Sequence, residues 1–148
     1  MPVIGWSKDF LVGIKDIDEN HRYLMRLLNE TYDGYVLGIV TDLFNLDELF
    51  QCLTDCFVYE EILMIGTSYC SYLAHKASHE LFKINFLEMY NNNNTNEFID
   101  ILMFFNNWVY RHIRDADSKF GDFLRAESLG LVQKPRYSSS AAREYLGA

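Results

Sequence analysis

The stretch between residues 56 and 79 constrains the fold more than any other part of the sequence. It carries Glu60 and Glu61 inside the apolar run FVYEEILMI, followed by His75 and His79 four residues apart. Residues at positions i and i+4 lie one above the other on the same face of an α-helix. Carboxylates and imidazoles on two antiparallel helices can therefore meet inside a helical bundle, where metal sites are built. The stretch predicts two helices that face each other across such a site.

Apolar residues recur at three- and four-residue steps through the rest of the chain, and no long strand-like alternation interrupts them. We therefore predict an all-α, antiparallel up-down-up-down four-helix bundle. An extended N-terminal arm is expected over residues 1–17, the bundle over 18–126, and a tail over 127–148 with a short helix at 141–146. The expected helices begin at Asp16 or Asp18, at Thr41 or Asp42, at Ser68 or Tyr69, and at Thr95 or Asn96; the first three end near Gly34 or Gly38, near Gly66 and at Tyr90.

Composition narrows the class of protein. A length of 148 residues suggests one domain. The net charge of −8, without a basic cluster, argues against binding to nucleic acid or to an anionic membrane surface. No apolar run approaches the roughly 18 residues of a membrane span, and the first residues do not resemble a signal peptide. We expect a cytoplasmic location, where the three cysteines would remain thiols.

The four histidines point to a metal. His21, His75, His79 and His112 all fall in predicted helices, on or beside the apolar stripes. One such histidine is usually a hydrogen-bonded core residue. Four histidines on three helices are better explained by a shared metal. Known motifs exclude two classes: no glutamate directly follows His75, as a metalloprotease requires, and no Glu-x-x-His sequence of the ferritin-like type is present.

Carboxylates that could join the histidines are less clearly marked. Glu60 and Glu61 are neighbours, so one should face the interior, and the spacing from Phe57 favours Glu60. After His112, spacing favours Asp115. Asp117 lies five residues on, about 140° round an ideal helix.

These residues together resemble the hemerythrin family, in motifs that span residues 6 to about 124. The matching motifs, in order, are Trp6, Phe10, Val12, Gly13 and Ile14 followed by Ile17-Asp18-Glu19-Asn20-His21; Phe57-x-x-Glu60-Glu61-x-x-Met64; His75-x-x-x-His79-x-x-Phe82; and Trp108-x-x-x-His112-Ile113-x-x-x-Asp117.

The resemblance implies a four-helix bundle that holds two irons, joined by two carboxylates and an oxo or hydroxo bridge. It implies that O2, or another small diatomic ligand, binds at an open position on one iron, with Phe57, Val109 and Ile113 as water-excluding neighbours. It also favours Asp117 over Asp115. The implied ligands are His75, His79 and His112 on one iron, Glu60 and Asp117 as bridges, and His21 on the other iron.

Cys56 departs from the family pattern, in which a histidine ligand precedes the phenylalanine. Three interpretations stay open: the thiolate binds iron, water fills the gap, or that iron is absent and one iron remains on the three-histidine side. Cys52 and Cys70 are expected to be buried as small apolar residues.

Three functions remain open on this basis. The first is reversible O2 binding as a carrier, store or sensor, without enzymatic turnover. The second is a modified iron site that reacts with peroxide or nitric oxide, or acts as a redox sensor. The third is an interaction module that docks through Tyr137, Arg143 and Tyr145 of the tail, although an unstructured terminus is favoured there, and the sequence indicates no particular protein partner.

Overall fold

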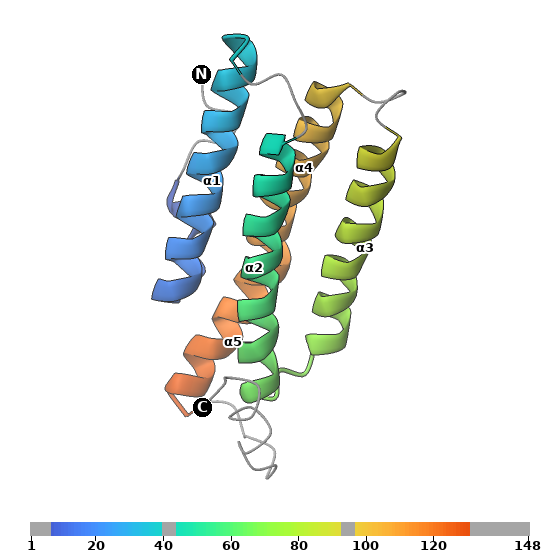
Figure 1. The fold of residues 1–148 in the computed structure, drawn as a ribbon. Helices are drawn as coiled ribbons and strands as arrows, with labels where there is room; N and C mark the ends of the chain where they lie inside the picture. The colour runs from blue at the N-terminus through green and yellow to red at the C-terminus, as the bar shows by residue number, and fades with distance from the viewer. Residues whose placement is uncertain (1–6, 40–43, 93–96, 131–148) are drawn as a thin grey trace.

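The computed structural model describes residues 7–39, 44–92 and 97–130, and these residues form an antiparallel four-helix bundle. Successive long helices run in opposite directions (Figure 1), and no strand occurs in the described ranges, so the predicted all-α fold class is confirmed. The elements are η1 (Lys8–Phe10), α1 (Lys15–Val36), α2 (Phe44–Gly66), α3 (Tyr72–Asn91), α4 (Phe98–His112), the π-helical turn η2 (Ile113–Asp117) and α5 (Ser118–Ser128).

Several predicted features lie outside the described residues. They are Trp6 in the arm, the helix-starting candidates Thr41, Asp42, Thr95 and Asn96, and the tail from residue 131 with its expected helix at 141–146.

Helix ends differ from the prediction where backbone geometry decides them. The helix α1 begins at Lys15, before Asp16 and Asp18, and its N-cap Ile14 makes no side-chain capping bond. The helix α3 begins at Tyr72 rather than at Ser68 or Tyr69. Ser68 instead adopts a left-handed conformation with φ of 55° and ends α2. The hydrogen bond from the Tyr69 N–H to the Met64 carbonyl completes that C-terminal motif.

The N-terminal arm is hydrogen-bonded to both α1 and α5. Asp18 accepts hydrogen bonds from the N–H groups of Val12 and Gly13, at 2.8 and 3.2 Å, instead of capping α1. The Val12 carbonyl accepts a hydrogen bond from Arg125 of α5. A Cβ atom on Gly121 would lie 2.2 Å from the same carbonyl oxygen, so this close approach requires glycine. The arm therefore holds α5 against the start of α1.

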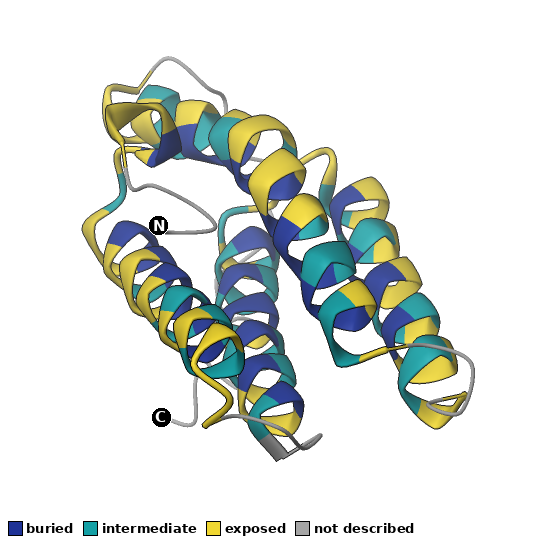
Figure 2. Cartoon of the chain, turned by 90° about the horizontal axis from the view of Figure 1, so that it is seen from above, coloured by how far each residue is buried: buried dark blue, intermediate teal, exposed yellow. Residues whose placement is uncertain are grey.

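Buried residues lie on the inward faces of the helices (Figure 2), and the apolar ones form two separate clusters. The larger cluster includes Leu24, Phe57, Phe82 and Val109. The smaller one is formed by buried Val12, Ile17, Met64 and Phe120. On α1, His21 falls between Ile17 and Leu24, and on α2, Glu60 falls between Phe57 and Met64. A layer of buried polar residues thus separates the two apolar clusters.

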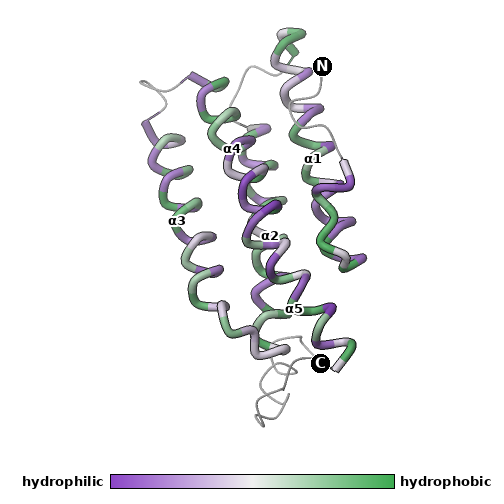
Figure 3. Tube along the Cα trace, turned by 180° about the vertical axis from the view of Figure 1, so that it is seen from behind, coloured by the Kyte–Doolittle hydropathy of each residue, from purple (hydrophilic) through white to green (hydrophobic). Residues whose placement is uncertain are grey.

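Hydrophilic and hydrophobic residues alternate along the helices at the interval of a turn, as Figure 3 shows by colour. Within residues 7–39, 44–92 and 97–130, no helix combines the length and apolarity needed to cross a membrane.

Candidate metal centre

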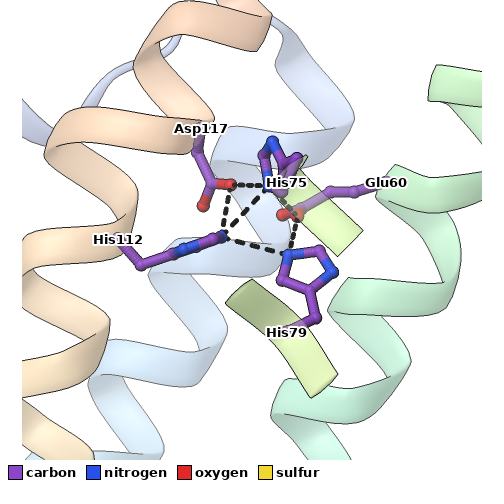
Figure 4. A group of neighbouring side chains, drawn as sticks. All are labelled: Glu60, His75, His79, His112 and Asp117. Atoms are coloured by element: carbon purple, nitrogen blue, oxygen red, sulfur yellow. Dashed lines mark hydrogen bonds and ion pairs between the residues drawn. The ribbon is translucent and has the colours of Figure 1, made fainter. Parts of the chain in front are cut away.

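Five side chains from four helical elements converge in the polar layer. Their potential donor atoms all lie within 4.8 Å of one another, and the side chains point toward a common centre (Figure 4). Each of the five residues is buried, with an exposed fraction between 0 and 8%. The group consists of Glu60 from α2, His75 and His79 from α3, His112 at the end of α4 and Asp117 at the end of η2.

The distances between these donors match the edges of a metal coordination shell. The Nε2 atom of His112 lies 3.1 Å from Nε2 of His75 and 3.1 Å from Nε2 of His79. Oδ1 of Asp117 lies 3.0 Å from Nε2 of both His75 and His112. Metal–nitrogen bonds of about 2.1 Å place neighbouring donors of an octahedron about 3.0 Å apart.

Hydrogen bonds alone do not satisfy these atoms. A ring nitrogen carries either one proton or one lone pair, so Nε2 of His112 cannot serve both of its imidazole neighbours well. Among the described residues, Oε2 of Glu60 and Oδ1 of Asp117 are buried without a hydrogen-bond partner. A cation at the centre would satisfy all five groups, and imidazole with carboxylate is a donor set that suits iron.

His21 lies on the opposite side of the two carboxylates. Its Nε2 atom is 3.1 Å from Oε1 of Glu60 and 3.3 Å from Oδ2 of Asp117. The other oxygens face the three-histidine side: Oε2 of Glu60 is 3.4 Å from Nε2 of His79, and Oδ1 of Asp117 is 3.0 Å from His75. Each carboxylate therefore presents one oxygen to each side.

The π-helical turn η2 explains why Asp117 rather than Asp115 joins the site. A π-turn holds more residues per turn than an α-helix. The five-residue step from His112 to Asp117 therefore returns to the same face. Asp115 is exposed and pairs with Lys119 at 2.9 Å. The preference for Asp115 from α-helical spacing was wrong because this segment is not α-helical.

Neighbouring groups fix the orientation of the imidazoles. Phe57 stacks on His79 with ring centroids 3.8 Å apart, and Trp108 stacks on His112 at 4.3 Å. Nδ1 of His79 is hydrogen-bonded to Oε1 of Glu61 at 2.9 Å. Helical spacing predicted only that Glu61 points away from the interior. Glu61 does lie on a different face of α2 from Glu60. The sequence alone could not show that this face contacts His79 on the adjacent helix α3.

Charges within the site are mutually stabilised. Burial alone would lower the pKa of His21, but Asp117 and Glu60 outweigh it and raise this pKa to about 10. The same balance raises the pKa of His75 to about 9. Burial and Asp117 would raise the pKa of Glu60, but the histidines lower it to about 2. The pKa of Asp117 is likewise lowered, because His112 and the other imidazoles overcome its burial. The carboxylates and the imidazoles thus favour each other's charged forms.

Cys56 lies one helical turn before Glu60, with 6% of its surface exposed. It lies at a groove of about 670 Å³ between α1 and α2, which Cys52 and Tyr59 also line. A hydrogen bond between the two thiols lowers the pKa of Cys52 and, together with burial, raises that of Cys56. The expected burial of the other cysteines was wrong: Cys52 is partly exposed, and Cys70 is exposed.

Fold and site together define a four-helix-bundle protein with a buried centre of imidazoles and carboxylates. The chain is 34% identical over 113 residues to a bacteriohemerythrin of Aquifex aeolicus. The matched residues cover 72% of this chain and 86% of that relative. It is 27% identical over 138 residues to the bacteriohemerythrin of Pseudomonas aeruginosa, covering 90 and 89% of the two chains. A hemerythrin of Phascolopsis gouldii is 27% identical over 115 residues, 78% of this chain and 88% of that one.

The chain belongs to the hemerythrin family, and this membership supports a non-haem iron protein of the oxygen-binding type. No protein-family model and no solved structure matches it.

Proposed function

We propose that this chain binds two irons in the polar layer and binds O2 reversibly there, as a carrier, store or sensor. The arrangement of the two carboxylates carries the proposal. Glu60 and Asp117 each direct one oxygen to the three-histidine side and the other to His21, which is the arrangement of bridging ligands. His75, His79 and His112 would hold one iron, and His21 would hold the other.

The family ligand set implies that ferrous iron, when bound, supplies the electrons and the open coordination position for O2. The protein supplies position and a dry environment. Phe57, Val109 and Ile113 are 1 to 3% exposed and belong to the apolar cluster on one side of the site. Phe120 and Met64, both fully buried, cover the other side. Low water access around the centre would slow loss of electrons to solvent-borne oxidants.

Cys56 leaves the His21 side with one imidazole less than the family pattern. Its side chain lines the groove between α1 and α2. We therefore propose that His21, Glu60 and Asp117 are the protein ligands of the second iron, with water at the position of the missing imidazole.

An iron count tests whether the chain binds two irons, and an absorption measurement tests whether it binds O2 reversibly. The full chain is loaded with ferrous iron without oxygen, and iron per chain is measured by elemental analysis. Two irons are expected, and one in the matched variant His21→Ala. Exposure to O2 should then produce a charge-transfer absorption band that disappears on deoxygenation. One iron in the wild-type chain would contradict the bridged pair, and an irreversible band would contradict reversible O2 binding.

A second candidate function follows from the same cysteine. If the Cys56 thiolate binds the second iron, the site would be tuned toward reaction with peroxide or nitric oxide, or toward redox sensing. Cys56→His restores the family ligand, and Cys70→Ser is the control at an exposed thiol. A sulfur-to-iron absorption band that is lost in Cys56→His and kept in Cys70→Ser would favour this function. Equal spectra and equal oxidation rates in all three proteins would exclude it.

A further inference from the structure

Cys52 and Cys56 form a thiol pair on the side of α2 that faces the groove. They are separated by four residues within one continuous helix, so their side chains lie on the same face. Both line the groove of about 670 Å³ between α1 and α2. Cys56 is buried, and Cys52 is partly exposed.

The spacing of the pair is wrong for a disulfide. Residues at i and i+4 of a helix have Cβ atoms about 5–6 Å apart, whereas a disulfide requires about 3.5–4.5 Å. Closing the bond would therefore distort α2. A bridging atom with two bonds to sulfur of about 2.3 Å spans thiolates up to about 4.6 Å apart. The helix can hold such a bridge without distortion.

The geometry points to a binding site, separate from the iron centre, at which Cys52 and Cys56 together bind one soft thiophilic centre such as Cu(I) or trivalent arsenic. Soft ions prefer thiolate to the imidazole and carboxylate donors of the polar layer. The groove has room for an organic substituent beside Tyr23 and Leu27, which also line it. This inference rests on the proposal that water, and not the Cys56 thiolate, completes the second iron site; a count of free thiols tests it without reference to the iron content.

Phenylarsine oxide is a suitable probe because it joins two nearby thiols. Two As–S bonds form, and the oxide oxygen leaves as water with the two thiol protons, so the oxidation state of arsenic does not change. The iron-loaded full chain is treated with the probe. The mass of the adduct is measured by mass spectrometry, and the remaining free thiols are counted. One adduct per chain with the loss of two of the three thiols is expected.

Matched variants locate the adduct. Cys70→Ser should bind the probe as the wild-type chain does, because Cys70 is exposed and outside the groove. Cys52→Ser should bind it about 100-fold more weakly, because the second bond is no longer intramolecular. Unchanged binding in Cys52→Ser, loss of binding in Cys70→Ser, or consumption of only one thiol in the wild-type chain would overturn the inference. The thiol count tests the wild-type chain directly, so the conclusion survives if a variant fails to fold.

Discussion

Nδ1 of His79 lies 2.9 Å from Oε1 of Glu61, the residue directly after the carboxylate that faces the site. Two adjacent glutamates on α2 thus contact opposite sides of the centre: Glu60 faces the donors, and Glu61 holds one imidazole from behind. A carboxylate that accepts a hydrogen bond from the outer N–H of a ligand histidine fixes the tautomer of that histidine and raises its basicity.

We predict that Glu61→Ala weakens metal binding by about 10- to 100-fold, the usual loss for such a partner. The measurement is a competition titration of ferrous iron against a chromophoric chelator. Glu88→Ala, which removes an exposed carboxylate from α3, is the control and should bind iron like the wild-type chain. Equal affinities in the two variants would show that Glu61 has no such role.

Asp117 and Asp115 provide a matched pair on one segment. Asp117→Asn should reduce iron binding by more than about 100-fold, beyond the loss typical of an outer partner, because it removes a proposed bridging charge. Asp115→Asn removes only the exposed pair with Lys119 and should leave the iron content unchanged. Elemental analysis of the two loaded variants checks both outcomes. Iron loss in Asp115→Asn instead would contradict the assignment from the π-turn.

The stability of the metal-free chain should depend on pH in both directions. The folded pKa values of His21 and His75, about 10 and 9, exceed the ordinary value of 6.5. Their contribution is therefore complete below pH 6.5 and is lost as pH rises through these folded values. The pKa of Glu60 is lowered from 4.5 to about 2, so its contribution is complete above pH 4.5 and is lost as pH falls toward 2.

Maximum stability of the metal-free chain is thus expected between about pH 4.5 and 6.5. Urea unfolding of the metal-free chain at pH values within this range and on both sides of it measures the free energy of unfolding. His21→Gln should flatten the alkaline decline because it removes one of the two raised groups. A free energy of unfolding that increases from pH 6.5 to 9 would contradict the proposed charge pairing.

Gly121 should not tolerate a side chain. A Cβ atom there would lie 2.2 Å from the Val12 carbonyl oxygen, which is backbone and cannot turn aside. Gly121→Ala should lower the free energy of unfolding by about 1–3 kcal/mol, the usual cost of overpacking. Lys119→Ala on the exposed face of α5 is the control, expected within about 0.5 kcal/mol of the wild-type chain. Denaturant unfolding of both variants compares them, and an unchanged Gly121→Ala would show that the arm can move away.

The helical architecture was predictable because apolar periodicity directly reports which face of each helix is buried. The inward direction of Glu60 followed from the same reasoning and is confirmed by its 2% exposure. The face occupied by Asp117 was not predictable from spacing, because the sequence of residues 113–117 does not indicate a π-turn. Only the family resemblance favoured Asp117 as a site residue. The contact of Glu61 with His79 depends on which helices are neighbours, and helical periodicity alone does not specify a partner atom.

The separation of the apolar interior into two clusters has a consequence for how the centre is assembled. Burial of the clusters on either side fixes the helices on which the donors lie. Bringing three imidazoles and two carboxylates together costs free energy. Burial of the two apolar clusters, whose side chains are not metal ligands, offsets this cost during folding. Iron would meet a preorganised cavity, and its affinity would include little of the ordering entropy that a disordered ligand set must lose.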